Sequence, residues 1–150
     1  MGSAEVALIV LASVAGVPAF FSFILFLLSK VGGWSALADR YRTDRPFQGS
    51  LWKYQFGFLG LTRYNGALTV GSGSEGLYLA VLFFLRPFHP PLMIPWSEVA
   101  LGRRKKTLFQ ELVEFRLGPE PLASLWLYDS LAQQIASAPG AYLRTPIPPA

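Results

Sequence analysis

An uncharged apolar segment near the N-terminus constrains the fold of this chain more than any other feature. Residues 6–29 read VALIVLASVAGVPAFFSFILFLLS and contain no charged side chain. About 20 apolar residues in a helix cross the hydrocarbon core of a bilayer, which is ~30 Å thick. Pro18 falls inside the segment, but membrane helices tolerate proline. The sequence therefore predicts one transmembrane helix at 6–29, preceded by a short N-terminal segment at 1–5.

A cleaved signal peptide is the alternative interpretation of this segment, because residues 36–38 read Ala-Leu-Ala and resemble an A-x-A cleavage site. Three features oppose it. Glu5 and no basic residue precede the segment, and the segment is longer than the usual apolar region of about 7–15 residues. Lys30 and two glycines also separate it from the Ala-Leu-Ala site. These features favour a helix that is retained.

The distribution of basic residues predicts the orientation of this helix. None precedes the apolar segment, and several follow it closely. The positive-inside rule then places the N-terminus outside and the following domain in the cytoplasm, on a single-pass protein of the inner (cytoplasmic) membrane. The basic residues that follow the segment first are Lys30, Arg40, Arg42, Arg45 and Lys53.

Composition excludes several classes of site. Hydrophobic residues make up 52% of the chain and charged residues only 15%, compared with roughly 25% in average soluble proteins. The absence of cysteine excludes disulfides, thiolate catalysis and cysteine-based metal centres. There is one histidine, and the acids are scattered, with Glu111 and Glu114 expected on opposite sides of a strand. We therefore expect no metal, no cofactor and no enzymatic activity.

Four phenylalanines in the second half of the apolar segment cannot all lie on one face of a helix. They either pack against helices of other subunits or contact lipid, and the sequence leaves both interpretations open. These residues are Phe20, Phe21, Phe23 and Phe26.

The juxtamembrane part at 30–46 contains GWSALADRYR, which predicts a short helix with apolar residues at i, i+3, i+4 and i+7. Trp34 and Tyr41 suit the membrane interface. In that position the arginines at 40, 42 and 45 reach lipid phosphates. The alternative is a helix that packs on the domain behind it.

Residues 47–138 change to short segments rich in aromatic and branched side chains, separated by Gly, Pro and Ser. Asn65-Gly66 and Ser74-Glu75-Gly76 are expected to form hairpin turns, because Gly and Asn accept positive φ. LYLAVLFFL is too short to be a second span and is expected to be a buried central strand. Pro95 places the next strand at an edge or a bulge. The predicted strands are WKYQFGFLGLT, ALTVGS, LYLAVLFFL, PLMIPW, LVEFRL and SLWLYD.

The segment DSLAQQIASA predicts a C-terminal helix, capped by Asp129 or Ser130, with Leu131 and Ile135 on one face. The tail at 139–150 is proline-rich and expected to be extended. The predicted fold class is therefore an α+β membrane protein. One transmembrane helix and one short juxtamembrane helix precede a small, mainly antiparallel β domain, which a C-terminal helix closes.

Three segments carry a resemblance to known proteins: the turn EGLYL, the segment HPPLMIPWSEV and the juxtamembrane GWSALADRYR. Together they resemble uncharacterised bacterial membrane proteins with one N-terminal span and a pleckstrin-homology-like (PH-like) or GRAM-like domain. The resemblance implies a PH-like β domain at 47–138. In that family PLMIPWSEV looks like the strand in which many members carry an Ile-Pro-hydrophobic step. The resemblance transfers no catalytic motif.

The segment RPFHPP at 86–91 contains the only histidine of the chain. Its three prolines cannot donate ladder hydrogen bonds, so the segment is expected to be a loop or an edge. No nucleophile or acid stands beside His89 in the sequence, so we expect a structural or exposed histidine. The loop is also expected to form an apolar tip that contacts a partner or the membrane. The residues of this predicted contact are Phe88, His89, Pro90 and Pro91.

Four adjacent cations follow in EVALGRRKKTLFQE and are expected in an exposed loop between two strands, because burying unpaired charges is costly. They either hold anionic lipid headgroups, at about 1 kcal/mol per cation, or form a solvated hairpin end that protects a sheet edge. Nucleic acid is not an expected partner, because no recognition helix stands out. The four cations are Arg103, Arg104, Lys105 and Lys106.

The segment GSGSEG at 71–76 has the spacing G-x-G-x-x-G but is expected to join two strands, so we interpret it as a turn rather than a nucleotide loop. The sequence then favours a non-catalytic accessory subunit that packs on a larger inner-membrane assembly, such as a respiratory or photosynthetic energy-converting complex. The alternative function is binding of anionic lipid or peptide at the cytoplasmic surface. Membrane lipids and other subunits are the expected partners.

Overall fold

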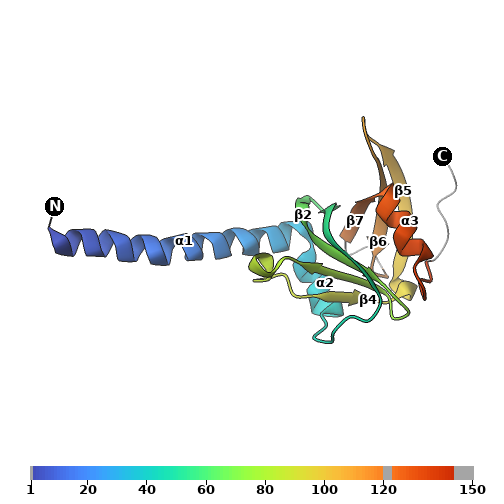
Figure 1. The fold of residues 1–150 in the computed structure, drawn as a ribbon, viewed down its shortest axis with the longest axis horizontal. Helices are drawn as coiled ribbons and strands as arrows, with labels where there is room; N and C mark the ends of the chain where they lie inside the picture. The colour runs from blue at the N-terminus through green and yellow to red at the C-terminus, as the bar shows by residue number, and fades with distance from the viewer. Residues whose placement is uncertain (1, 120–122, 144–150) are drawn as a thin grey trace.

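The computed structural model describes residues 2–119 and 123–143, which form a long N-terminal helix joined to a β domain (Figure 1). Most of the tail predicted at 139–150 lies outside the described residues. The helices are α1 (Ser3–Gly32), α2 (Trp34–Tyr41) and α3 (Asp129–Ser137), with 3₁₀ helices η1 (Phe83–Leu85) and η2 (Trp96–Glu98). The strands are β1 (Ser50–Leu59), β2 (Thr62–Ser72), β3 (Leu77–Val81), β4 (Leu92–Ile94), β5 (Val99–Lys106), β6 (Glu111–Leu117) and β7 (Ala123–Tyr128).

Helix α1 confirms the predicted apolar helix and extends it to 30 residues, about 45 Å at 1.5 Å per residue. Pro18 lies inside it without ending it. Only 6% of the residues in its most apolar 18-residue stretch are buried against the rest of the protein. The buried positions Leu25, Ser29 and Gly32 lie at the end that meets the domain. Helix α1 is thus long and apolar enough to cross a bilayer, a property that N-terminal signal sequences share.

The last turn of α1 fits closely against the turn between β1 and β2. A Cβ atom at Gly32 would lie 2.7 Å from Oγ1 of Thr62, and one at Gly60 would lie 2.8 Å from the carbonyl oxygen of Gly32. The Thr62 hydroxyl donates a hydrogen bond of 3.2 Å to the carbonyl of Leu28. Because the two glycines permit this approach, packing rather than a free linker joins α1 to the domain.

Helix α2 starts directly after Gly33, which ends α1 with a φ of 86°. Trp34 and Leu37 are fully buried, and Tyr41 is 5% exposed. The predicted interface role therefore does not fit Trp34 and Tyr41, because neither side chain reaches the surface. The alternative of a helix packed on the domain applies, and α2 lies beside the edge strand β4.

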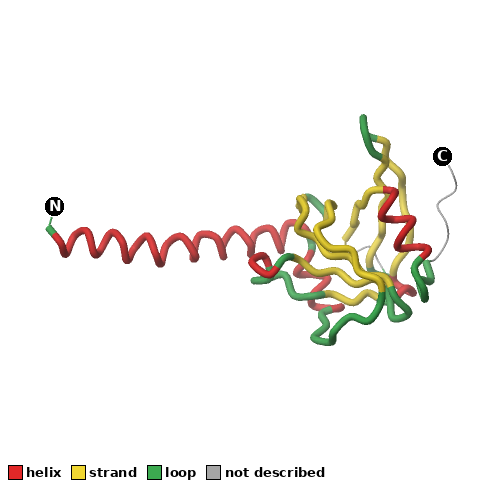
Figure 2. The backbone as a smooth tube through the Cα atoms, in the orientation of Figure 1, coloured by secondary structure: helices red, strands yellow, loops and turns green. Residues whose placement is uncertain are grey.

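The strands form one antiparallel sheet of seven strands in the order β4-β3-β2-β1-β7-β6-β5 (Figure 2). The sheet is curled, and within the described residues its end strands β4 and β5 do not pair with each other, so it is open rather than a closed barrel. The outer edge of β4 carries one isolated bridge, between Leu92 and Arg42. Helix α3 packs on β2, β6 and β7. Side chains of α2, α3 and the strands meet in one hydrophobic core.

One predicted hairpin turn is confirmed and one is wrong. GSGSEG joins β2 to β3, and the N–H of Gly73 donates to the carbonyl of Gly76 at 3.2 Å. Asn65-Gly66 instead lies inside β2, beside a shift in the register with β1, where Gly66 has a φ of 69°. The chain reverses earlier, at Gly60, which has a φ of 57°.

The segment LYLAVLFFL is only partly the strand that its pattern predicts. Strand β3 ends at Val81, and it lies next to the edge strand rather than at the centre of the sheet. The following residues turn into η1, where Phe83 and Phe84 are exposed. The prediction that Pro95 marks an edge is confirmed, because β4 ends at Ile94 and is an edge strand.

The C-terminal helix is confirmed, with Leu131 and Ile135 in the core. Its N-cap is Tyr128, one residue before the expected cap, and the Asp129 side chain is the acid of the first turn.

The close packing at the foot of α1 predicts a position-dependent cost for adding a methyl group. Gly32→Ala should lower the free energy of unfolding by about 1–3 kcal/mol, because the new Cβ overpacks against Thr62 and Leu59. Gly16→Ala is the matched control on the same helix, with no atom within 4 Å of the added Cβ. It should leave stability unchanged or raise it by up to about 1 kcal/mol. Thermal unfolding of the full chain in mild detergent measures both, and equal effects would contradict the packing described here.

Candidate functional site

The loop that contains RPFHPP is fixed to the domain by hydrogen bonds. The Trp34 indole Nε1–H donates to the carbonyl of Pro90 at 2.9 Å. The N–H of Thr43 donates to the carbonyl of Pro91 at 3.0 Å, which ties the chain after α2 to the end of the loop. His89 forms hydrogen bonds through both ring nitrogens. The proline-rich connection is therefore held as a defined structure between η1 and β4.

The hydrogen bonds of His89 determine its tautomer. Nδ1 lies 3.1 Å from the carbonyl of Pro87, and Nε2 lies 3.1 Å from the hydroxyl of Tyr64. A carbonyl can only accept, so Nδ1 carries the proton and the Tyr64 hydroxyl donates to Nε2. Burial lowers the pKa of His89, and burial raises the pKa of Tyr64. The pair is therefore neutral and its hydrogen bonds are satisfied internally.

The surface of this loop differs from the predicted contact tip. His89 is 1% exposed and lies beneath the loop, so it cannot contact a partner. Phe88 is 48% exposed, and Pro90 and Pro91 are half-buried. Sequence reasoning missed Phe83 and Phe84, which are 77% and 51% exposed.

The rings of Trp34, Tyr64 and His89 pack against one another. Their centroids are separated by 5.8 Å for Trp34 and Tyr64, 5.4 Å for Trp34 and His89, and 6.0 Å for Tyr64 and His89. They come from α2, β2 and the loop. No sequence signal paired His89 with Tyr64, since the two residues are 25 positions apart.

A pocket of about 300 Å³ lies where α1 meets the domain. Leu25 and Leu28 of α1 form one wall, and Phe84 and Leu85 of η1 form another. His89 also lines this pocket, but both of its ring nitrogens already take part in hydrogen bonds. The pocket offers mainly apolar contact, with no acid beside the histidine that would support proton transfer.

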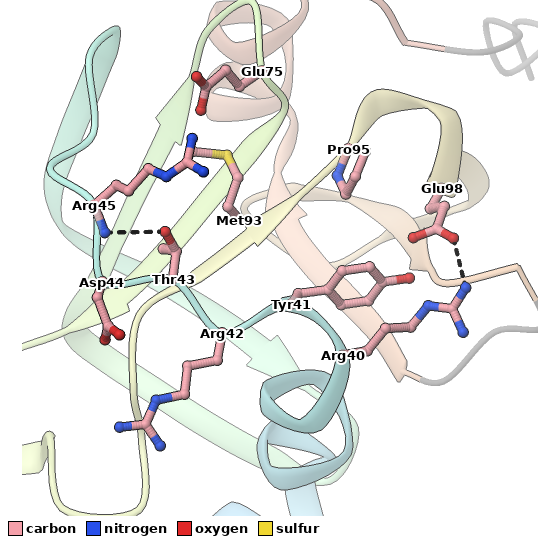
Figure 3. Close-up of a pocket in the computed structure, with 10 residues that line it drawn as sticks. All are labelled: Arg40, Tyr41, Arg42, Thr43, Asp44, Arg45, Glu75, Met93, Pro95 and Glu98. Carbon is pink, nitrogen blue, oxygen red and sulfur yellow. Dashed lines mark hydrogen bonds and ion pairs between the residues drawn. The ribbon is translucent and has the colours of Figure 1, made fainter.

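Arg40 in the last turn of α2, with Arg42 and Arg45 after it, lines a second, larger cleft of about 530 Å³ (Figure 3). Arg40 pairs with Glu98 at 2.9 Å. Arg42 and Arg45 form no ion pair with any residue that the structure describes. Figure 3 shows the guanidinium groups of the three arginines pointing in different directions. They therefore do not form a convergent anion site, and the acids Asp44, Glu75 and Glu98 line the same cleft.

Tyr41 lines this cleft from the side of the core. Its hydroxyl is buried and lies near the Glu98 carboxylate without a hydrogen bond of good geometry. Burial and the neighbouring carboxylate raise the pKa of Tyr41 to about 12. The Tyr41 hydroxyl and the Arg40 guanidinium in turn lower the pKa of Glu98, so this end of the cleft holds a carboxylate whose charge is already compensated.

The four cations expected in a loop lie instead at the end of β5. Successive residues of a strand face opposite sides, so they do not form one cluster. Arg104 donates to Glu111 at 3.3 Å and to Asp129 at 2.9 Å, which links β5, β6 and α3. Lys105 and Lys106 carry no ion pair within the described parts of the chain.

Arg103 faces the buried carboxylate of Glu114, whose oxygen lies 3.5 Å from its guanidinium. Burial alone would raise the pKa of Glu114, but the hydrogen bonds that it accepts from the Arg116 side chain and the Arg103 N–H lower it. Glu111 and Glu114 thus face different partners, as their spacing in a strand predicts. Arg103 and Arg104, which were expected to bind lipid headgroups, therefore form ion pairs within the domain.

Sequence reasoning missed the apolar tip of the β5–β6 hairpin. Leu108 and Phe109 are each 88% exposed, and only Thr107 separates them from Lys105 and Lys106. Figure 1 shows this hairpin projecting sideways from the domain, across the direction of the α1 axis. The signal in the sequence was the pair of large apolar residues inside the turn TLFQ, where polar residues are usual.

Of the phenylalanines in α1, Phe26 packs on the domain, with its ring 5.3 Å from that of Phe88. Phe20 is 68% exposed and Phe23 is 55% exposed, and Phe21 is also open to the surroundings of the helix. Across residues 2–119 and 123–143, histidine and acidic side chains form no group of three that could hold a metal ion.

The buried neutral His89 predicts a loss of stability at mildly acidic pH. Its pKa in the folded state is lowered from 6.5, so the unfolded state binds the proton first and gains stability as the pH falls below about 6.5. The free energy of unfolding should therefore decline as the pH falls below about 6.5. The matched variant His89→Gln should be less stable but should lack this decline.

Glu98 and Glu114 do not cause the decline just below pH 6.5. Their pKa values are lowered from 4.5, so the stability that these carboxylates contribute is lost only at lower pH. Thermal unfolding of both proteins in mild detergent at several pH values measures the difference. Identical pH dependence in the two proteins would contradict a neutral, buried His89.

In comparisons with known proteins, no family model, no curated protein and no solved structure matches the chain.

Proposed function

We propose that this protein is a non-catalytic, membrane-anchored accessory subunit. In this proposal α1 crosses the inner membrane, and the β domain stands on the cytoplasmic side and stabilises a larger assembly. The observation that carries it is the contrast within α1. The helix presents a bare apolar surface along most of its length, while its last turn is packed tightly against the domain. A free tether would not need that packing.

Retention of α1, rather than cleavage as a signal peptide, is supported by the core of the domain. Cleavage after Ala38 would remove Trp34 and Leu37, which are both fully buried in the hydrophobic core. Losing two large core side chains costs several kcal/mol, which is comparable to the total stability of many domains. The fold of the β domain therefore depends on the residues that cleavage would take away.

The positive-inside rule supports the cytoplasmic orientation, because the basic residues closest to the apolar segment at 6–29 all follow it. Lys30 lies in its last turn, and Glu5 lies in its first turn. Arg40, Arg42 and Arg45, which line the larger cleft, add to the number of basic residues on the domain side of the apolar segment.

We take the PH-like resemblance as the finer description of the domain. It is supported by the order of elements, an antiparallel sheet of seven strands followed by one helix that packs on it. The sheet departs from a closed barrel, because among the described residues its two end strands, β4 and β5, do not pair with each other. Domains of this type serve mainly as surfaces for lipids, peptides or other proteins, which agrees with a role in assembly.

The apolar tip of the β5–β6 hairpin is the surface that best fits another subunit. Two large apolar side chains that are almost fully exposed are unfavourable in water and mark contact sites. The tip projects sideways from the domain, beyond the C-terminal end of α1, so a bilayer around α1 does not cover it. Lys105 and Lys106 next to it favour a partner with acidic groups around an apolar patch.

Gentle detergent extraction from the native membrane should therefore recover the tagged chain in a complex much larger than 16.5 kDa. Native gel separation with mass spectrometry names that assembly. Leu108→Ser/Phe109→Ser should reduce co-migration severalfold, because it removes the apolar contact. Tyr142→Ser is the control, since Tyr142 is 77% exposed elsewhere on the surface. A chain that migrates alone would contradict the proposal.

Binding of anionic lipid is the second candidate function, and the unpaired Arg42 and Arg45 of the cleft favour it. Each cation near a membrane surface contributes about 1 kcal/mol to the attraction for anionic lipid. Their different directions suit a field of headgroups rather than one bound molecule.

Anionic lipid should raise the thermal stability of the full chain in nanodiscs, because a ligand that binds the folded state stabilises it. Arg42→Gln/Arg45→Gln should reduce that gain by about 2 kcal/mol at low salt. Lys105→Gln/Lys106→Gln is the control with the same loss of charge. Equal effects of the two double variants would assign the attraction to net charge and reject the cleft.

A further inference from the structure

We propose that the loop at residues 82–91, which contains η1, is a second membrane-contacting element that inserts aromatic side chains at the boundary between headgroups and hydrocarbon. This inference rests on the proposed function, in which α1 crosses the bilayer. It adds a lipid contact made by the β domain itself.

The loop lies beside α1, at the level of the helix's apolar segment. The ring of Phe88 packs edge-on against Phe26 of α1, with 5.3 Å between centroids. Phe84 lines one pocket together with Leu25 and Leu28 of α1. Figures 1 and 2 show η1 alongside the C-terminal turns of α1 rather than beyond its end. A bilayer that covers residues 6–29 of α1 therefore meets the loop as well.

The side chains that face outward from the loop are aromatic. Phe83 is 77% exposed, Phe84 is 51% exposed and Phe88 is 48% exposed. Leu61, in the neighbouring turn between β1 and β2, is 87% exposed. Because Phe88 touches Phe26, this apolar surface continues the apolar surface of α1. Lipid covers both at once, which relieves the cost of exposing the rings to water.

Seven of the ten backbone positions in the loop at 82–91 either lack an N–H group or donate it to a backbone carbonyl, which suits a poorly hydrated place. An N–H group without a partner is costly where water is scarce. Three of the residues at 82–91 are prolines and have no N–H. Four further N–H groups donate backbone hydrogen bonds within the domain, and these belong to Leu82, Leu85, Arg86 and His89.

Polar side chains of the loop are also satisfied. His89 is neutral and bonded at both nitrogens, and the Tyr64 hydroxyl is its partner. Basic side chains stand at the margin of the aromatic surface. Arg86 and Arg63 are exposed, and Lys30 lies 5.7 Å from the centre of the Phe26 ring. Long basic side chains in such positions reach headgroup phosphates while their stems cover apolar surface.

The absence of cysteine allows a direct test by single spin labels on the full chain in nanodiscs. The labelled variants are Phe84→Cys in the loop, Phe20→Cys in α1 and Leu108→Cys at the hairpin tip. Collision with oxygen reports contact with lipid, and collision with a water-soluble nickel chelate reports contact with water. The three native side chains are all exposed, so each label has room.

We expect the label at 84 to collide more with oxygen than with nickel, as at 20 and opposite to 108. A nickel-accessible label at 84 with a lipid-exposed label at 20 would overturn this inference and leave the proposed anchor intact. A nickel-accessible label at 20 would overturn both. A label at 84 that collides with neither reagent is covered by protein, for example by a second copy of the chain, and would also overturn the lipid contact.

Discussion

The burial of Trp34 is the contact on which the rest of the structure depends. This side chain begins α2 one residue after α1 is terminated, and it is fully buried in the core of the domain. Its indole N–H holds the proline-rich loop through the carbonyl of Pro90. One residue thus connects the apolar helix, the sheet and the loop. Without it, the core would lose a large buried side chain and the loop would lose the indole that holds Pro90.

The same contact explains why the single histidine of the chain is structural. Trp34 and Tyr64 enclose His89 and remove it from water, so the neutral imidazole is favoured. A buried imidazole needs a partner at each nitrogen, and the Pro87 carbonyl and the Tyr64 hydroxyl supply them. The prolines make this arrangement stable, because they restrict the loop and reduce the number of N–H groups that need partners.

Local signals in the sequence were sufficient for the elements but not for their partners. The uncharged segment before Lys30, the edge at Pro95 and the face of Leu131 and Ile135 depend on residues close in sequence. The apolar helix, the strand edge and the C-terminal helix were predicted correctly, because a long apolar run, a missing N–H and a helical period need no tertiary information. The turn GSGSEG is local in the same sense.

The remaining features are decided by residues far apart in the chain. Asn65-Gly66 was interpreted as a turn because a β-bulge and a hairpin turn both use a residue with positive φ. Trp34 could not be placed from the sequence, because tryptophan is common both at membrane interfaces and in protein cores. Only the tertiary structure shows which of the two lies next to α2. Arg104 meets Asp129, 25 residues later, only because β5 pairs with β6 and α3 begins beside them.

In the proposed membrane-anchored state, the contact between Gly32 and Gly60 has a consequence for how the protein responds to its bilayer. Transmembrane helices tilt by about 20° on average and adjust that tilt to the thickness of the hydrocarbon core. A helix joined by a loose linker tilts alone. A helix packed directly on its domain turns the domain through the same angle, so for this chain membrane thickness would set the height of the β5–β6 hairpin above the lipid surface.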